Sequence, residues 1–428
     1  MKFAKIGVLV LAASLLAGSA LAAAPKEPTV RASTRGIVFN NGINDAVIGQ
    51  AKAANPNPDA SYRLAEIKDA DLATFVAAFP DVMKLSVSGD ALTSIAPLAK
   101  LTKLTELSIE SSAISKGITD MSPVSNLTGL KKLNARTSAS DLKWMAKLTN
   151  LSSISLTGTK LTSFEGLPAL PTLRKISLQE GKPANFDPLL VLPELTELDL
   201  TRADLTGADF AALAKLPKLK NINLYGAKIK DFSPLAACPA LRELMYYATK
   251  ESDYSTLGKL TQIEILKGGL TELKDISWVS TLPNLKKFDV FAEYVTDYSP
   301  LTHCKKLEYF KIWKMHAPLD VAALAKVTWL KMLVIDDMDD VKNLPALAGM
   351  TGLERLALKK VNNKSGDPIN AADFAKLPNL KELELDSSTK VTGLDGLKAA
   401  PALTKLRVDK SIPDDQLAGL PQTIKVKK

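Results

Sequence analysis

The sequence predicts an α/β solenoid, in which a curved parallel sheet forms the concave face and short helices, 3₁₀ turns and loops form the convex face. Three observations predict this fold. Short stretches with an apolar residue at every second position recur along most of the 428 residues, and seven of the fifteen steps between them are 22 residues long. The return segments between the stretches often contain Ser-Pro-Leu or Ala-Pro-Leu. Alternation is typical of strands, and a constant period of this length is typical of stacked repeats.

The first inward-facing apolar residue of each expected strand marks its repeat. We place these residues at Leu85, Leu107, Leu133, Ile154, Ile176, Leu198, Ile222, Leu244, Leu266, Phe288, Phe310, Leu333, Leu356, Leu383, Leu406 and Ile424. A single repeat cannot bury its own leucines, so stacked repeats build one continuous core. At about 4.8 Å per strand, the sheet is roughly 70 Å long. In two longer repeats we expect true short helices, at Leu205–Leu216 and Ile369–Leu377.

The return segments carry a family resemblance. The stretches "IKDFSPL" (Ile229–Leu235) and "VTDYSPL" (Val295–Leu301) are followed by Leu or Cys at regular intervals before the next strand. They resemble the 22-residue leucine-rich repeats of bacterial internalins. The resemblance covers the chain from about Leu85 onward and implies a leucine-rich repeat solenoid, but it does not specify a ligand.

The resemblance also implies an Asn after each strand, whose amide bonds the backbone of the turn. This sequence has no Asn at these positions, and Ala227, Met315 and Val361 are examples whose side chains cannot replace the amide. Because buried backbone groups are almost always paired, we expect either ordered water at these turns or turns of a different geometry.

Residues 1–22 have the three parts of a secretory signal peptide. Two lysines form a basic start, Ile6–Leu16 is an apolar run, and Ala20–Ala22 is a small-residue cleavage site. Ser19 stands where lipidation requires a Cys, so we expect no lipid anchor. No later apolar run is long enough to span a membrane. We therefore expect an exported protein, periplasmic or secreted.

The rest of the chain divides into three predicted parts. Residues 23–60 form an N-terminal lead-in that is partly flexible, with a helix near Ile43–Ala53. Residues 61–84 form a helical cap, with a helix at about Asp69–Ala78 that covers the first leucines of the solenoid. Residues 85–428 form the leucine-rich repeat domain, with about sixteen strands.

The charge pattern argues against a nucleic-acid partner. The net charge of +9 comes from 55 Lys and Arg residues against 46 Asp and Glu residues, and the two signs alternate along the chain. The sequence has no basic stripe and no recognition helix. We expect a solvated surface of mixed charge and no nucleic acid.

Motifs for catalysis and metal binding are missing as well. The chain has two histidines and contains no CxxC pair, HExxH motif or EF-hand loop. His303 precedes Cys304, but adjacent residues on a return segment point apart, so we expect no nucleophilic pair. The acidic run Ile335–Asp340 is expected to be a solvated turn in preference to a cation site. We therefore expect no enzyme, no metal and no cofactor.

The two cysteines provide a check on the repeat register. Cys238 and Cys304 occupy the same leucine position of repeats that start 66 residues apart. Three stacked repeats separate them by about 14 Å, whereas a disulfide spans at most about 7 Å between Cα atoms. We expect two buried free thiols.

One outward position of the expected strands carries a run of aromatic residues. In five successive repeats it holds Tyr225, Tyr247, Gly269, Phe291 and Trp313. Even spacing should align them into one concave patch, and a large exposed aromatic patch is typical of an interaction site. Gly269 is expected to leave a notch that a ligand side chain or sugar ring enters. The predicted binding residues are Tyr225, Met245, Tyr247, Lys267, Phe291, Tyr309, Lys311 and Trp313.

These features predict a non-enzymatic, exported, monomeric binding protein that recognises a protein or peptide partner through the aromatic patch. A carbohydrate is the alternative ligand, because aromatic rings also stack on sugars. A further alternative is a structural scaffold of the cell envelope that uses the convex face, in which case the rings only stabilise the sheet by stacking on one another.

Overall fold

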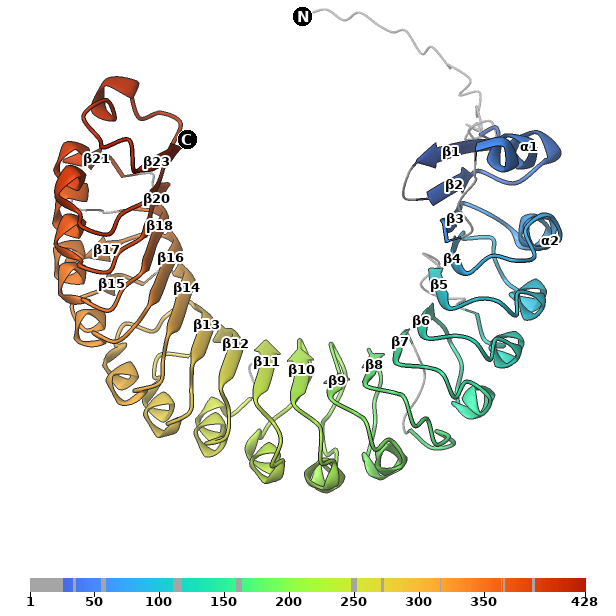
Figure 1. Ribbon diagram of the computed structural model, residues 1–428. Coiled ribbons are helices and arrows are strands. Elements are labelled where there is room, and N and C mark those ends of the chain that lie inside the picture. Colours follow the sequence, from blue (N-terminus) through green and yellow to red (C-terminus); the bar gives the residue numbers. More distant parts are fainter. Residues whose placement is uncertain are drawn as a thin grey trace, which may run out of the picture.

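The computed structural model is a long arch with a parallel sheet on its inner side and 3₁₀ segments on its outer side (Figure 1). It describes residues 26–33, 36–54, 59–110, 118–158, 164–247, 252–270, 273–315, 317–362, 364, 366–386 and 389–428. The predicted signal peptide, residues 1–22, lies outside the described residues. The curved parallel sheet and the convex 3₁₀ turns confirm the predicted solenoid.

Nineteen strands form the main sheet. They are β1 (Thr29–Ser33), β2 (Gly36–Asn40), β3 (Ser61–Ala65), β4 (Lys84–Ser88), β5 (Glu106–Glu110), β6 (Lys132–Arg136), β7 (Ser153–Thr157), β8 (Lys175–Gln179), β9 (Glu197–Asp199), β10 (Asn221–Tyr225), β11 (Glu243–Tyr247), β12 (Ile265–Leu270), β13 (Lys287–Ala292), β14 (Tyr309–Met315), β16 (Met332–Met338), β18 (Arg355–Val361), β20 (Glu382–Asp386), β22 (Lys405–Val408) and β23 (Lys425–Lys427). Two small parallel pairs are β15 (Leu319–Asp320) with β17 (Val341–Lys342), and β19 (Ile369–Asn370) with β21 (Val391–Thr392).

The helical segments lie on the outer, convex side of the arch (Figure 1). Two are α-helices, α1 (Asp45–Ala54) and α2 (Asp69–Ala78). The 3₁₀ segments are η1 (Ala96–Lys100), η2 (Ser122–Asn126), η3 (Lys143–Met145), η4 (Asp187–Val191), η5 (Ala211–Lys215), η6 (Ser233–Ala237), η7 (Tyr254–Lys259), η8 (Ser277–Thr281), η9 (Ser299–His303), η10 (Leu324–Lys326), η11 (Leu344–Gly349), η12 (Ala371–Lys376), η13 (Leu394–Ala399) and η14 (Asp414–Gln416).

The predicted strand register is confirmed from β4 to β22 and is wrong at β23. Each of the first fifteen predicted inward residues, from Leu85 to Leu406, pairs with its counterpart on the next strand. On β23 the partner of Leu406 is Val426, two residues after the predicted Ile424. The last repeat is the shortest, and Ile424 completes the turn before the strand, where its amide bonds the carbonyl of Pro421. Val426 remains 40% exposed, because no described strand stacks on it.

The sheet begins well before Leu85, where the sequence placed its first strand. β3 pairs in parallel with β4 and places Tyr62 beside Leu85, and β2 pairs in parallel with β3. The two expected N-terminal helices are present as α1 and α2. Phe75 of α2 packs edge-on against Phe39 of β2 and against Tyr62. The segments that contain β2 and β3 are therefore further coils of the solenoid, whereas β1 pairs antiparallel with β2 at the end of the sheet.

The convex segments begin with a capped 3₁₀ turn. In the Asp-x-Ser-Pro segments the Asp carboxylate accepts two hydrogen bonds from the Ser, as Asp297 does from the amide (2.8 Å) and hydroxyl (2.9 Å) of Ser299. The expected helices at Leu205–Leu216 and Ile369–Leu377 are also 3₁₀ segments, η5 and η12, and not α-helices. Each has only five or six residues, which is too few for a stable run of i to i+4 hydrogen bonds.

The turns without Asn use backbone hydrogen bonds in place of a side-chain amide. Met315 and Val361 both pair with Met338 of the strand between them, so that these strands extend into the turn. The residue before each, such as Lys314 with a φ of 56°, has a left-handed conformation. The amide of Ala227 bonds a carbonyl within its own turn at 3.0 Å. The second expectation, a different turn geometry, is therefore confirmed at these positions.

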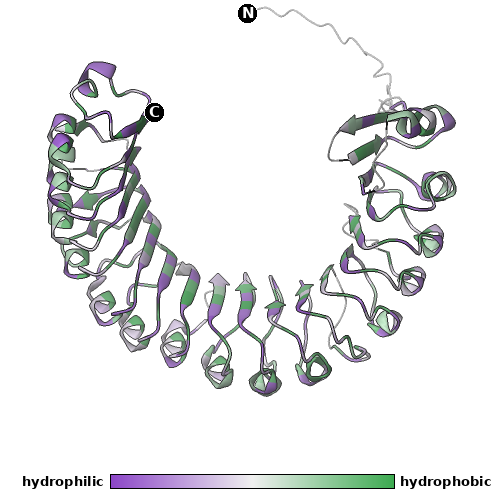
Figure 2. Ribbon diagram, in the orientation of Figure 1, coloured by the Kyte–Doolittle hydropathy of each residue, from purple (hydrophilic) through white to green (hydrophobic). Residues whose placement is uncertain are grey.

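One apolar core runs through the whole arch (Figure 2). Phe310 and Ile312 of β14 are fully buried in it, as alternation predicts. Cys238 and Cys304 are buried and free, which confirms the expectation from their spacing. Burial raises the pKa of each thiol to about 11.

Candidate functional site: the concave aromatic surface

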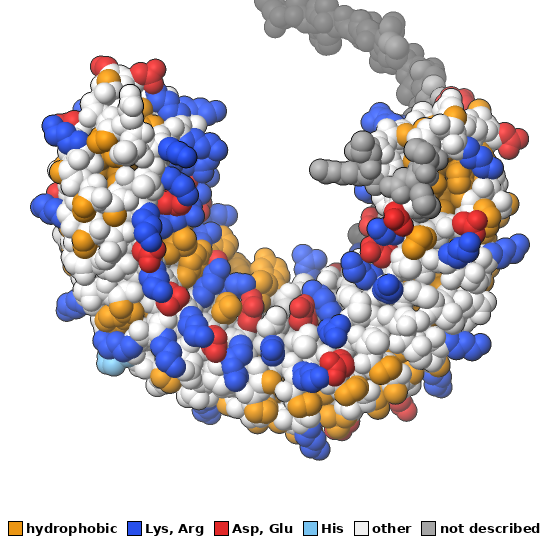
Figure 3. Space-filling view, in the orientation of Figure 1, with side chains coloured by type: hydrophobic (Ala, Val, Ile, Leu, Met, Phe, Trp, Pro, Cys, Tyr) orange, Lys and Arg blue, Asp and Glu red, His pale blue; other side chains and the backbone are white. Residues whose placement is uncertain are grey.

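The aromatic run lies on the concave side of β10 to β14. We call this the concave aromatic surface and define it by the eight predicted residues Tyr225, Met245, Tyr247, Lys267, Phe291, Tyr309, Lys311 and Trp313. Tyr225 is exposed and the other seven side chains are half-buried, and the strand pairing brings all eight to one region of the sheet. Figure 3 shows orange hydrophobic side chains on the inner floor of the arch, next to the arm that ends at the C-terminus.

Each of the strands β10 to β14 has three outward-facing positions, and equivalent positions on successive strands form three outward rows. In the third row, the rings of Tyr225, Tyr247, Phe291 and Trp313 form one continuous column. Ring centroids are 5.2 Å apart between Tyr225 and Tyr247, 6.0 Å between Tyr247 and Phe291, and 5.2 Å between Phe291 and Trp313. Tyr247 and Phe291 are stacked with their planes 15° apart, although a strand lies between them. Such contacts contribute about 0.5–1.5 kcal/mol per pair. The column is therefore ordered before any ligand arrives.

The expected notch at Gly269 does not exist. A Cβ atom at Gly269 would lie 2.3 Å from two ring carbons of Tyr247, so the tyrosine ring already occupies that space. The ring of Tyr247 leans across the glycine toward Phe291, and this is how the stack crosses β12. Gly269 serves the ring column and offers no opening to a ligand.

The preceding residues also approach each other closely, on the buried side of the sheet. Tyr246 is fully buried, and a Cβ atom at Gly268 would lie 1.8 Å from its carbonyl oxygen and 3.0 Å from its ring. At Gly268 the close approach is therefore mainly to the backbone of Tyr246, whereas at Gly269 it is to the ring of Tyr247. Only Gly269 is required by a large side chain of the preceding strand.

The two predicted lysines of the surface are held by carboxylates. Lys267 lies 2.5 Å from a carboxylate oxygen of Glu243, and Lys311 lies 3.8 Å from one of Asp336. All four side chains are largely buried, with 25–29% of each exposed. These lysines do not present unpaired charge to a ligand.

The remaining charges next to the rings are also engaged. The indole N–H of Trp313 donates to a carboxylate oxygen of Asp289 at 3.2 Å. The ammonium of Lys287 lies 4.2 Å from the ring centre of Tyr309, where a cation–π contact stabilises both groups. The surface is therefore close to electrically balanced: its outward rows on β10 to β14 carry three basic and two acidic side chains, and Asp336 of the next strand, β16, pairs with Lys311.

Two phenols of the surface are held in their neutral form. Burial, followed by the nearby Tyr225 and the charge of Glu293, raises the pKa of Tyr247. Burial and the charge of Asp289 raise the pKa of Tyr309. At neutral pH both hydroxyls are hydrogen-bond donors at the edge of an apolar patch.

Sequence reasoning missed two features of this region. One is the Trp313–Asp289 hydrogen bond, which joins two adjacent strands. It could have been predicted because the two residues lie in neighbouring outward rows, one repeat apart. Ile265 lies on the first outward row beside Glu243 and adds apolar surface.

Other candidate chemistry is not supported within the described residues. No group of three or more His, Cys, Asp or Glu side chains there could hold a metal ion. In the acidic run Ile335–Asp340, Asp340 is buried and accepts the amide of Lys364 at 3.1 Å. Cys304 faces the core and donates its thiol to a backbone carbonyl, away from His303 on the surface. No described helix has the length and apolar character needed to cross a membrane.

Solved structures show the same fold. No protein-family model and no curated protein matches the chain. An LRR protein of Leptospira interrogans, LIC12759, is 17% identical over 90% of this chain and 93% of its own, with a TM-score of 0.51. TLR13, in complex with ssRNA13, is 17% identical over 92% of this chain and 69% of its own, with a TM-score of 0.57. An internalin (inlF) of Listeria monocytogenes is 22% identical over 86% of this chain and 93% of its own, with a TM-score of 0.41. The first two of these structures show that the chain has a leucine-rich repeat fold.

Proposed function

We propose that this chain is a non-enzymatic binding protein that recognises a protein or peptide partner through the concave aromatic surface. The observation that carries the proposal is the continuous column of four rings on an accessible face. Tyr225 at one end of the column is 44% exposed, so part of its ring is open to a partner. Tyr and Trp are also the commonest hot-spot residues of protein interfaces.

The charge balance of the surface favours a protein over a nucleic acid. Nucleic-acid binding depends on basic side chains that neutralise phosphates. Here Lys267 and Lys311 are paired with carboxylates, and Lys287 lies over a ring. An apolar segment of a partner could cover the rings without displacing these contacts.

The ring contacts also favour a peptide or protein over a sugar. A sugar stacks on the flat face of an aromatic ring. Stacking between Tyr247 and Phe291 uses part of that face, and the ammonium groups of Lys311 and Lys314 lie 5.3 and 6.0 Å from the ring centre of Trp313. Aliphatic and aromatic side chains of a peptide have no such geometric requirement.

We further propose that the protein acts outside the cytoplasm as a monomer. The proposal of export rests on the signal-peptide pattern of residues 1–22. An exported concave surface meets partners of the envelope or of the surroundings. Its partner is accordingly sought among secreted and surface proteins.

Photo-crosslinking at one position on each face tests the proposal. The photoreactive residue p-benzoylphenylalanine replaces Phe291 on the concave surface or, as the matched control, Leu190 on the convex segment η4, which is 40% exposed. Incubation with envelope and secreted proteins, followed by irradiation, should give a discrete adduct from position 291 only. Adducts from position 190 alone would indicate a convex scaffold. No adduct together with a positive glycan array would indicate a carbohydrate.

A further inference from the structure

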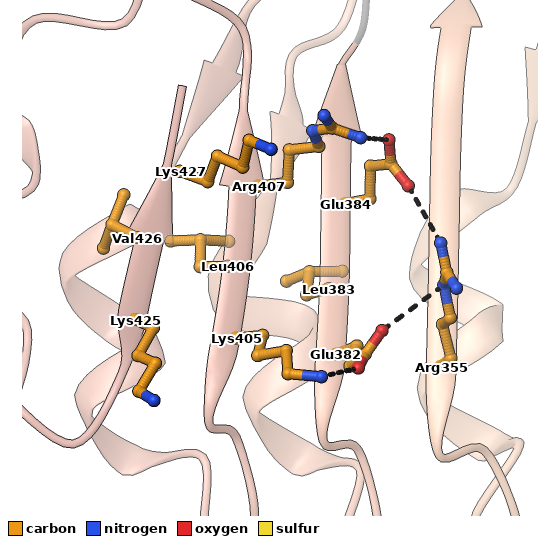
Figure 4. A pocket seen from close by; sticks show the side chains of 10 residues that line it. All are labelled: Arg355, Glu382, Leu383, Glu384, Lys405, Leu406, Arg407, Lys425, Val426 and Lys427. Atoms are coloured by element: carbon orange, nitrogen blue, oxygen red, sulfur yellow. Dashed lines mark hydrogen bonds and ion pairs between the residues drawn. The ribbon is translucent and has the colours of Figure 1, made fainter. Parts of the chain in front are cut away.

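A hollow lies on the concave face apart from the aromatic surface, at the C-terminal end of the sheet (Figure 4). Its volume is about 310 Å³. It spans β18, β20, β22 and β23 and is lined by Arg355, Glu382, Leu383, Glu384, Lys405, Leu406, Arg407, Lys425, Val426 and Lys427. Five of these ten side chains are basic and two are acidic, so the hollow has a positive surplus that the concave aromatic surface lacks.

A buried carboxylate organises one part of the hollow. The side chain of Glu384 is only 7% exposed, and its oxygens lie 3.2 Å from Arg407, 3.4 Å from Arg355 and 3.7 Å from Lys359. A buried carboxylate requires such partners to offset its desolvation. Both guanidinium groups therefore face Glu384, while 40% and 48% of the Arg355 and Arg407 side chains stay exposed to a ligand.

A second carboxylate pairs with basic groups of the adjoining row. Glu382 lies 3.6 Å from Arg355 and forms a close ion pair with Lys405. Arg355 therefore bridges the two carboxylates, as the dashed contacts in Figure 4 show. Three of the five basic groups therefore have carboxylate partners within the hollow.

The other two basic groups have no carboxylate. Lys425 and Lys427 of β23 form no ion pair with any described residue, and Figure 4 shows them beside Lys405 and Arg407. Asp386 at the end of β20 and Asp409 directly after β22 do not line the hollow. Two unpaired ammonium groups next to the array of paired basic groups form a surface for negative charge.

We propose that this hollow binds an acidic segment, rich in Asp or Glu, of a polypeptide partner. Its basic groups extend over four adjacent strands, about 14 Å at 4.8 Å per strand. That width exceeds a single small anion and matches several carboxylates of an extended chain. The surplus is also modest, because Glu382 and Glu384 remain inside the array, so the hollow suits a short acidic segment.

The two concave sites lie close enough for one partner to reach both. Four strand steps separate Trp313 on β14 from Arg407 on β22, about 19 Å. An extended peptide spans this distance with about six residues. We infer a partner in which an apolar segment is followed or preceded, about six residues away, by an acidic one. The inference of a two-segment partner rests on the proposed function, whereas the proposal that the hollow binds an acidic segment rests only on the residues that line the hollow.

Binding of a labelled octaglutamate peptide tests the hollow directly. Fluorescence anisotropy is measured with the full chain at low salt, where charge contacts between exposed groups are least screened. The variant Lys425→Gln with Lys427→Gln removes the two unpaired charges. Its matched control, Lys376→Gln with Lys398→Gln, makes the same charge change on the convex segments η12 and η13 of the same region.

We expect the wild-type chain to bind octaglutamate, and the concave double variant to bind it about two- to tenfold more weakly, since exposed ion pairs are individually weak. The convex control should bind like the wild type. The variant with Tyr247, Phe291 and Trp313 changed to Ala should still bind octaglutamate. The proposal for the hollow and the proposal for the concave aromatic surface are therefore tested independently. Absence of wild-type binding, or equal weakening by both lysine variants, would overturn the proposal. Stronger, Lys425- and Lys427-dependent binding of a heparin oligosaccharide or of oligo(dT) would also overturn it.

Discussion

The ring of Tyr247 lies over Gly269, and a methyl group at Gly269 would meet its Cδ2 and Cε2 atoms at 2.3 Å. This contact between neighbouring strands lets Tyr247 stack on Phe291 two strands away. A residue that appeared to be a gap in the aromatic row is thus the reason that the row is continuous.

Replacing Gly269 by Ala should break this stack. The Cβ atom forces the Tyr247 ring away, and overpacking of this kind costs about 1–3 kcal/mol. Thermal melting and near-ultraviolet circular dichroism measure the loss of stability and of ring order.

In a Tyr247→Ala background the Gly269→Ala substitution should lower stability much less, because the two residues interact directly. Gly349→Ala, where the added Cβ meets only a carbonyl oxygen at 3.9 Å, is the control with little effect. Additive effects of the Gly269 and Tyr247 substitutions would contradict the contact.

Replacing Tyr246 by Phe should preserve or raise stability. The hydroxyl of Tyr246 is buried and has no hydrogen-bond partner among the described residues. An unsatisfied buried polar group costs about 1–3 kcal/mol, and the substitution removes it without changing the ring. Urea unfolding measures the difference. Tyr254→Phe is the matched control and should lower stability, since that hydroxyl donates to the carbonyl of Gly269 at 3.3 Å. A loss of stability in Tyr246→Phe similar to that of the control would show that the hydroxyl has a partner.

The two thiols should be unreactive in the native protein. Cys238 and Cys304 are each 1% exposed, and burial raises the pKa of both to about 11. At pH 8 the folded chain should react with neither DTNB nor iodoacetamide, while the chain in guanidinium chloride should react at both positions. Mass spectrometry of a non-reducing digest should show two separate cysteine peptides. A peptide pair joined through these residues would contradict the repeat register.

Aspartates at the convex turns should make the protein sensitive to acid. Hydrogen bonds from Ser122, the hydroxyl first, lower the pKa of Asp120 from 3.8, and hydrogen bonds from Asn343 and then from the Ala322 amide do the same for Asp320. A lowered folded-state pKa stabilises the fold above the unfolded pKa, and the contribution is lost as the pH falls through the folded value.

The variant with Asp120 and Asp320 both changed to Asn tests this relation. At pH 7 it should be less stable than the wild type, and the difference should narrow as the pH falls below about 4. Urea unfolding at pH 7, 4 and 3 measures it. A difference that stays constant or widens toward pH 3 would contradict the assignment.

The repeat register could be predicted because the inward rows are almost uniformly apolar. A period of two within strands and of about 22 between them leaves one alignment for Leu85 to Leu406. The prediction fails where these signals weaken. Tyr62 and Phe39 take the inward positions of the N-terminal coils, and the last repeat is so short that Ile424 and Val426 both fit the pattern.

The sequence predicts which residues of the candidate site lie in the same outward row, but it does not predict the contacts between their side chains. Sequence identifies which residues share an outward row, because pairing is fixed by the register. It does not show which way a side chain leans. Tyr247 reaches across Gly269 because a large residue in one repeat and a glycine in the next compensate for each other. That complementarity becomes visible only when neighbouring repeats are aligned in pairs.

The affinity for an identified partner tests the central claim most directly. The dissociation constant is compared for the wild-type chain, for the variant with Tyr247, Phe291 and Trp313 changed to Ala, and for a control with Arg136, Thr157 and Gln179 of the same row changed to Ala. Loss of three hot-spot aromatic residues should weaken binding about a hundredfold or more, whereas the control should bind like the wild type. Melting temperatures of all three proteins show whether each remains folded. Unchanged affinity of a folded aromatic variant would contradict the concave aromatic surface as the binding site.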